Sequence, residues 1–160
     1  MDKSLRILVV DDERDILETL DYSLALRGFE VTTAADGLEA LEVAKRVKPD
    51  VMLLDVMLPG CNGYEVSRLL KEWMEHDPQA RSFPIMLLTA RKVDSQEREK
   101  FIATWSRADR TLYKPFDLDQ VRQGLFQEGA RLRGAAVQMG MQRRILFVSV
   151  LAMGAVAFEG

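Results

Sequence analysis

The chain has 160 residues, 48% of them hydrophobic and 29% charged, and a formal net charge of -3 at pH 7. This is the length and composition of one soluble globular domain with a short extension, and the charge excludes the basic surface that nucleic-acid binding usually needs. The single cysteine excludes an internal disulfide and suits a reducing cytoplasm, and no signal peptide is visible before the first apolar run.

The first part of the chain alternates short apolar runs with amphipathic segments. Residues 5–10 predict a strand that ends in three consecutive carboxylates, residues 11–13. The apolar spacing of residues 15–28 predicts a helix. A second strand over residues 29–35 and a second helix over residues 36–49 follow.

The third predicted strand, residues 51–54, leads directly into Asp55 and a turn rich in proline and glycine. A short apolar run of this kind is typical of a strand buried on both faces of a parallel sheet. Asp55 would then lie at the carboxyl end of its strand, where open α/β sheets bind ligands. A single aspartate before such a turn is more often a helix N-cap or turn residue, so its role depends on partners elsewhere in the chain.

The alternation continues through the second part of the chain. Residues 64–73 have helical spacing, residues 84–88 predict a fourth strand, and residues 94–105 predict a weakly amphipathic helix. A short strand over residues 110–113 precedes a fifth helix, which a capping box opens at residues 117–120. Five strand–helix units predict an α/β fold with a doubly wound parallel sheet.

Right-handed crossovers place the carboxyl ends of all these strands at one edge of the sheet. Five polar residues follow four of the strands: Asp11, Asp12, Asp55, Thr89 and Lys114. Three neighbouring carboxylates need a cation to stay ionised, and hard oxygen ligands favour Mg²⁺. With the ammonium of Lys114 and the hydroxyl of Thr89, this set suits phosphoryl transfer to a carboxylate, and Asp55 is the best nucleophile candidate.

Together these motifs resemble the receiver domain of two-component response regulators. The residues that carry the resemblance follow the first, third, fourth and fifth strands: Asp11-Asp12; Asp55 with Met57-Leu58-Pro59-Gly60 and Gly63; Thr89-Ala90; and Lys114-Pro115-Phe116. The resemblance covers about residues 5–133 and implies a flavodoxin-like sheet of order 2-1-3-4-5 with helices on both faces. We therefore expect a receiver domain in residues 1–133 and a C-terminal extension in residues 134–160.

The resemblance also implies the role of each site residue. Asp55 would accept the phosphoryl group, and Thr89 would bind a phosphoryl oxygen. Mg²⁺ would be held by Asp12 and Asp55, by Asp11 through water, and by the backbone carbonyl of Met57.

The resemblance further implies that Lys114 pairs with the phosphate and precedes a cis bond to Pro115. The donor would be a phosphohistidine on a sensor histidine kinase or a phosphotransfer protein. The domain would be a cytoplasmic phosphoacceptor, and not an enzyme, that switches the binding of an unidentified output partner or forms a homodimer.

Two features depart from the family pattern. The family usually has an aromatic residue three positions before the lysine, where this chain has Thr111. Tyr113 is expected on the other face of the strand, so we do not expect it to replace that aromatic. The chain between Asp55 and Thr89 is also longer than usual through residues 76–82, which predicts an extended third helix and loop or, alternatively, a partner contact.

The C-terminal residues 145–158 are apolar except for Ser149. This run is shorter than the about 20 residues that a membrane-spanning helix needs. A spanning segment cut short, a pairing strand and an apolar helix docked on a partner remain open, and we favour a helix that buries its apolar end against another chain. Glu159-Gly160 resembles a cloning scar, after which a longer parent chain would continue.

Two other functions are compatible with parts of the pattern. An aspartate-nucleophile phosphatase would need a second acidic residue two positions after Asp55, where this chain has Met57. A receiver-like interaction module that works without phosphate is supported only by Thr111.

Overall fold

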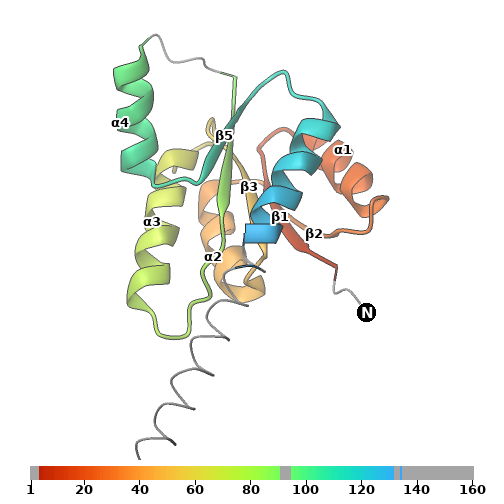
Figure 1. The fold of residues 1–160 in the computed structure, drawn as a ribbon, viewed down its shortest axis with the longest axis horizontal. Helices are drawn as coiled ribbons and strands as arrows, with labels where there is room; N and C mark the ends of the chain where they lie inside the picture. The colour runs from red at the N-terminus through yellow and green to blue at the C-terminus, as the bar shows by residue number, and fades with distance from the viewer. Residues whose placement is uncertain (1–3, 91–94, 132–133, 135–160) are drawn as a thin grey trace, which may run out of the picture.

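The computed structural model describes residues 4–90, 95–131 and 134, and its strands and helices alternate along the chain (Figure 1). The predicted apolar segment 145–158 lies outside these residues. A helix over residues 118–131 follows the last strand, and we call it the C-terminal helix. The elements before it are β1 (Arg6–Val10), α1 (Arg14–Ala25), β2 (Glu30–Ala34), α2 (Gly37–Val47), β3 (Val51–Asp55), α3 (Gly63–His76), β4 (Ile85–Thr89), α4 (Gln96–Ser106) and β5 (Arg110–Tyr113).

All five strands are parallel and lie in the order β2-β1-β3-β4-β5, which confirms the predicted doubly wound α/β sheet. Every residue of β3 and β4 is buried, as the uninterrupted apolar runs in the sequence indicate. In the described part of the chain, no helix is both long and apolar enough to cross a membrane.

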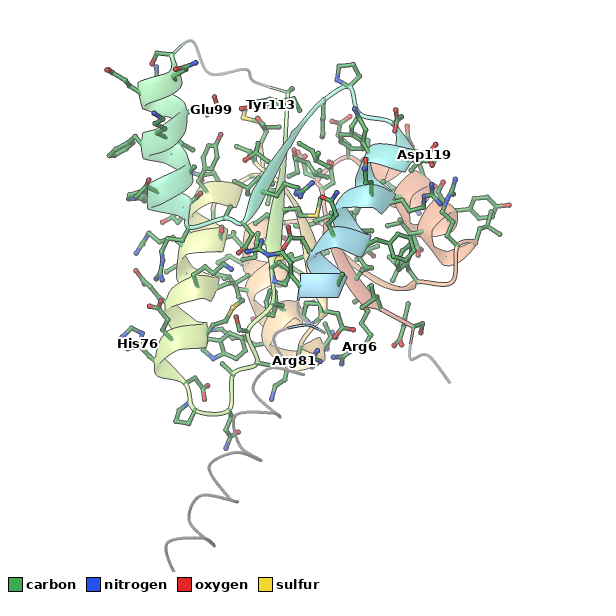
Figure 2. All side chains as sticks on the ribbon, viewed as in Figure 1. Arg6, His76, Arg81, Glu99, Tyr113 and Asp119 are labelled. Carbon is green, nitrogen blue, oxygen red and sulfur yellow. The ribbon has the colours of Figure 1, made fainter. Side chains whose placement is uncertain are left out.

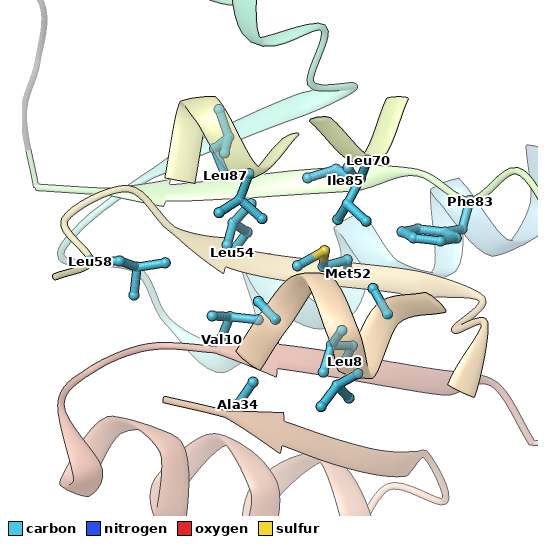
Figure 3. Packing of buried hydrophobic residues seen from close by; sticks show 14 of the residues in the cluster. Leu8, Val10, Ala34, Met52, Leu54, Leu58, Leu70, Phe83, Ile85 and Leu87 are labelled. Atoms are coloured by element: carbon cyan, nitrogen blue, oxygen red, sulfur yellow. The ribbon is translucent and has the colours of Figure 1, made fainter. Parts of the chain in front are cut away.

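Alternate residues of the strands build two separate cores, one on each face of the sheet. Figure 3 shows the first, in which strand residues such as Leu8, Met52 and Leu87 pack with residues of α2 and α3. On the other face, strand residues such as Val9 and Leu53 pack against α1 and the C-terminal helix. Because side chains alternate along a strand, one apolar run supplies both cores.

The predicted extension of the third helix is confirmed, because α3 continues to His76 and the loop begins only at Asp77. The last turn of α3 is closed by Trp73. Its Nε1 donates to the Asp77 carboxylate over 2.9 Å, and its carbonyl accepts from the Asp77 N–H. His76 is an exposed residue of the last helical turn.

The buried carboxylate of Asp50 pairs with two arginines at the end of the sheet where β1 begins. Asp50 is 7% exposed and accepts from the Arg6 N–H over 2.9 Å, and its other oxygen lies 2.7 Å from Arg81 Nη2. Arg6 and Arg81 lie together at the lower end of the molecule in Figure 2. Burial raises the pKa of Asp50, but the Arg6 hydrogen bonds and the two guanidinium charges outweigh it and leave that pKa below 3.8.

Asp50→Asn is expected to lower the free energy of unfolding by about 2 kcal/mol at neutral pH, because two guanidinium groups lose their buried partner. The pKa of Asp50 is lowered by folding, so its charge stabilises the protein above 3.8 and this contribution disappears as pH falls through the folded pKa. Urea unfolding at several pH values measures both effects. Asp119→Asn, which changes an exposed carboxylate, is the control, and an equal loss in both variants would contradict the prediction.

Candidate functional site

The register of the sheet gathers the predicted site residues at one edge. Val10 lies opposite Leu54 in the β1–β3 pair, so Asp11 follows β1 beside Asp55 at the end of β3. In the β3–β4 pair Asp55 lies opposite the residue before Thr89, which places Thr89 one step further along the same edge. Four strands therefore end at a single site, as the crossover rule predicts.

Three carboxylates form the centre of this edge. Asp11, Asp12 and Asp55 each offer an oxygen, and these atoms lie within 4.8 Å of one another. Asp11 and Asp55 are buried, at 0% and 3% exposure, whereas Asp12 is exposed. The backbone N–H of Glu13 donates to Asp11 over 2.9 Å, which orients that carboxylate. The cluster thus has a buried floor and one side that is open to solvent.

Lys114 bridges the two buried carboxylates. Its Nζ lies 3.1 Å from Asp11 Oδ2 and 3.2 Å from Asp55 Oδ1, and its own backbone N–H donates to the carbonyl of Thr89 over 2.7 Å. The peptide bond between Lys114 and Pro115 is cis, as the resemblance implies. One lysine side chain therefore links the end of β5 to the ends of β1 and β3.

Burial raises the pKa of Asp55, and the charge of Asp11 raises it further, while Lys114 opposes both effects. For Lys114, burial lowers the pKa, but the hydrogen bond and charge of Asp11, followed by those of Asp55, leave that pKa above its usual value. The lysine stays protonated, yet one ammonium does not offset two buried carboxylates. The site therefore carries an excess of negative charge, which a bound cation could neutralise.

The turn after β3 depends on Gly63, the first residue of α3. Its N–H donates to the carbonyl of Val56 over 3.0 Å, and an added Cβ would lie only 2.3 Å from the carbonyl oxygen of Asp55. Asn62 caps α3 by accepting from a backbone N–H over 3.0 Å. Met57, two residues after Asp55, exposes 61% of its surface. The chain thus folds back closely against the residue that bears the candidate nucleophile.

The expectation that Thr111 and Tyr113 lie on different faces of their strand is wrong. Two residues separate them along a strand, and a period of two puts both on the same face. Both line one cavity of about 310 Å³ together with Thr89, beneath α4. The tyrosine hydroxyl also donates to Glu99 of α4.

Sequence reasoning therefore missed Tyr113 and Glu99 as neighbours of the site. The two-residue period of the strand was a sufficient signal for Tyr113. No signal in the sequence pairs Glu99 with it, because the position of α4 over the sheet is a tertiary feature.

A doubly wound parallel sheet with three carboxylates, a threonine and a lysine at its carboxyl edge defines the class of receiver-like α/β proteins. The family model described as "Response regulator receiver domain" matches residues 7–126. The chain belongs to the response regulator receiver domain family.

Curated relatives are similar over most of this chain. It is 42% identical over 116 residues to the alkaline phosphatase synthesis transcriptional regulatory protein PhoP of Bacillus subtilis. The aligned residues cover 72% of this chain and 45% of PhoP. It is 41% identical over 117 residues to the response regulator MprA of Mycobacterium leprae, which covers 73% of this chain and 47% of MprA. The chain spans about half the length of these relatives.

Among solved structures, the chemotaxis protein CheY4 of Vibrio cholerae is similar with a TM-score of 0.68 and 28% identity, over 79% of this chain and 99% of that chain. A putative response regulator from Chloroflexus aurantiacus is similar with a TM-score of 0.68 and 30% identity, over 80% and 99%. Both likenesses extend over nearly all of the solved chain, so the receiver fold is matched as a whole.

Proposed function

We propose that this receiver domain accepts a phosphoryl group on Asp55 and that the modification changes its affinity for a partner protein. The observation that carries the proposal is the position of Asp55, buried at the end of β3 with Oδ1 3.2 Å from the Lys114 ammonium. Two further carboxylates lie within 4.8 Å. The Lys114 ammonium, together with a cation bound by the three carboxylates, would favour the ionised form of Asp55 despite its raised pKa.

In the proposed reaction, a carboxylate oxygen of Asp55 attacks the phosphorus of a phosphohistidine on a sensor histidine kinase or phosphotransfer protein. The P–O bond forms as the P–N bond breaks, and the donor nitrogen keeps the bonding electron pair. Lys114 neutralises charge on the transferring oxygens, and the hydroxyl of Thr89 binds one of them. The domain acts as an acceptor, without turnover of a separate substrate.

The donor set at this edge fits Mg²⁺, because carboxylate oxygens are hard ligands and the single Lys114 ammonium does not offset the charge of the three carboxylates. We assign its ligands to Asp12 and Asp55, with Asp11 assisting through water and the backbone carbonyl of Met57 as a further ligand. A bound Mg²⁺ would supply positive charge against the phosphoryl oxygens and so lower the barrier to transfer.

A groove beside Lys114 gives the donor protein a surface to contact. It has a volume of about 370 Å³ and lies between α1 and the segment that leads into the C-terminal helix, where Ile16, Leu20 and Phe116 line it. This apolar surface adjoins the carboxylate edge, which suits a partner that must bring its phosphohistidine to Asp55. We place the reaction in the cytoplasm, where the ATP that charges such a kinase is available.

Incubation with Mg²⁺ and acetyl phosphate, followed by intact-protein mass spectrometry, tests the proposed function. We expect an adduct of one phosphate that hydroxylamine removes, because an acyl phosphate is labile to that nucleophile. The absence of any adduct would contradict phosphoacceptor function and favour an interaction module that works without phosphate. Many phosphates released per protein from a phosphomonoester would instead indicate a phosphatase.

Mg²⁺ is expected to stabilise the protein by about 2.7 kcal/mol at a concentration near 100 times its Kd. The pKa of Asp55 is raised in the folded protein, so without metal this group favours folding below 3.8 and loses that contribution as pH rises through the folded pKa. Urea unfolding in EDTA and in Mg²⁺, at pH values from below 3.8 to neutral, measures both the stabilisation by Mg²⁺ and the pH dependence that comes from Asp55. Asp12→Asn should reduce the gain from Mg²⁺, and an unchanged gain would remove Asp12 from the ligand set.

A further inference from the structure

The loop of residues 56–62 follows β3 and carries the Met57 carbonyl that we assign to Mg²⁺. Figure 3 shows Leu58 of this loop among the residues of the first core, where it is 8% exposed. The side chain of Met57 is 61% exposed, so it does not hold the loop in place itself. The position of the Met57 carbonyl therefore depends on the other residues of the loop and on what they pack against.

Gly37, the first residue of α2, lies against the far end of this loop. It is buried, and a Cβ added to it would lie 2.4 Å from the Cys61 carbonyl oxygen and 3.0 Å from Cys61 Cβ. An ordinary contact needs at least 3.4 Å, so an alanine at this position would have to displace the carbonyl by about 1 Å. The backbone of α2 packs directly on the backbone of the loop because Gly37 has no side chain.

The start of α2 is itself fixed in place. Asp36 caps the helix by accepting from the Glu39 N–H over 2.8 Å, and the Glu39 carboxylate accepts in return from the Ala35 N–H over 2.8 Å. Ala40, one turn further along, is fully buried in the first core. These contacts resist a retreat of α2, so an atom added at Gly37 displaces the loop.

A shift of α2 would disturb the same site from its other side. The carbonyl of Ala34, at the end of β2, accepts a hydrogen bond from the Asp11 N–H over 3.3 Å, and residues 35 and 36 alone join Ala34 to α2. Asp11 is one of the three clustered carboxylates. Whichever segment moves, a side chain added at Gly37 therefore displaces a residue that we assign to the metal.

The side chain of Cys61 does not account for this contact. Burial, followed by the charge of Glu65 and a hydrogen bond to it, raises the pKa of the Cys61 thiol. The thiol therefore stays protonated at neutral pH and does not offer a thiolate to a metal ion. The atom that comes closest to the position of the added Cβ at Gly37 is the carbonyl oxygen of Cys61, which belongs to the backbone.

We propose that Gly37 is a positioning residue of the phosphoacceptor site: because it has no side chain, α2 holds the loop where the Met57 carbonyl can bind Mg²⁺. The proposal rests on the proposed function for the presence of the metal. Mg²⁺ needs near-octahedral ligands at about 2.0–2.1 Å, so a displacement of about 1 Å takes a ligand out of its coordination shell. Gly37 acts through the loop and supplies no ligand itself.

Titration of the full chain with Mg²⁺, followed by ¹H–¹⁵N NMR, tests the role of Gly37. Gly37→Ala is expected to raise the Kd for Mg²⁺ about tenfold, as is common when a group that supports metal ligands is displaced. The spectrum also reports whether the variant is folded, and urea unfolding in EDTA measures any change in stability separately. An unchanged or lower Kd in Gly37→Ala would overturn the proposal.

Two control variants separate the position of the loop from other effects. Gly124→Ala adds a Cβ 2.5 Å from Met86 Cε, the flexible end of a side chain in the other core. Cys61→Ala removes the thiol and keeps the backbone contact. Both should bind Mg²⁺ as the unmutated protein does. An equal rise of the Kd in Gly124→Ala would indicate general destabilisation, and an equal rise in Cys61→Ala would assign the effect to the thiol; either result overturns the role of Gly37.

A second pair of variants leaves Gly37 in place, so the test does not depend on the folding of Gly37→Ala. Asp36→Ala removes the cap that fixes the start of α2, whereas Asp36→Asn removes the same charge and keeps a capping side chain. We expect the Kd for Mg²⁺ to be about threefold higher in Asp36→Ala than in Asp36→Asn. Equal values would mean that α2 does not hold the loop.

These outcomes are distinct from those that test the proposed function. If the unmutated protein binds no Mg²⁺, the metal site fails and the role of Gly37 fails with it. If the unmutated protein binds Mg²⁺ and forms the phosphate adduct while Gly37→Ala binds Mg²⁺ equally well, only the role of Gly37 fails and the phosphoacceptor function stands.

Discussion

Asp55→Asn is expected to abolish the phosphate adduct and, at the same time, to stabilise the metal-free protein. An amide is not a nucleophile toward phosphorus, so the adduct should fall to background. Asparagine has almost the same shape and removes one of the two buried charges that Lys114 bridges. The raised pKa of Asp55 indicates that its ionised form opposes folding, so removing the charge should raise the free energy of unfolding at neutral pH.

Two measurements on the same variant check these outcomes. Intact mass after incubation with Mg²⁺ and acetyl phosphate reports the adduct, and urea unfolding in EDTA reports stability. Asp119→Asn changes an exposed carboxylate on the C-terminal helix and should leave both unchanged. Persistence of the adduct in Asp55→Asn would move the acceptor to another residue. A loss of stability would mean that Lys114 offsets the charge of Asp55 more fully than the raised pKa implies.

Gly63→Ala is expected to lower the free energy of unfolding by about 3 kcal/mol, the upper range for overpacking a close contact. The new Cβ would lie 2.3 Å from the Asp55 carbonyl oxygen and 2.8 Å from Val56 Cα, both backbone atoms. Because backbone cannot rotate away as a side chain does, α3 must move from β3. The 3.0 Å hydrogen bond from Gly63 to Val56 would then lengthen or break.

Gly129→Ala is the matched control for this substitution. Its Cβ would lie 2.8 Å from Leu5 Cδ1, the end of a flexible side chain, and alanine favours the helix by up to about 1 kcal/mol. We expect little change or a small gain in stability. Urea unfolding of both variants gives the comparison, and similar losses at the two glycines would contradict a special role for the turn after Asp55.

Much of the fold follows from patterns within short segments. The uninterrupted apolar run of β3 predicted a strand buried on both faces, and β3 is buried at every position. The capping box at Asp117 is present: its carboxylate accepts from the Gln120 N–H over 2.7 Å, and Gln120 Oε1 accepts from the Asp117 N–H over 3.1 Å. These features are local, so interactions among a few neighbouring residues determine them and the sequence is enough to predict them.

Contacts between residues of different helices and strands could not be predicted from these local patterns. In the sequence, Asp50 stands between a proline and a strand, and nothing nearby indicates its partners. Only the fold brings Arg6 and Arg81 to its carboxylate. Tyr113 is different in kind, because the two-residue period of a strand places it on the same face as Thr111 and this follows from the sequence alone. Its partner Glu99 is on another element, and that pairing depends on how α4 packs.

By itself, the sequence determined which chemical groups stand at the ends of the strands, because apolar runs, turn residues and the crossover rule define those ends one segment at a time. Only the tertiary structure decided that two of the three carboxylates are buried, that Lys114 lies 3.1 and 3.2 Å from them, and that Tyr113 ties β5 to α4. The physical reason is that burial and distance are set by the packing of whole elements, and these set the charge balance at Asp55.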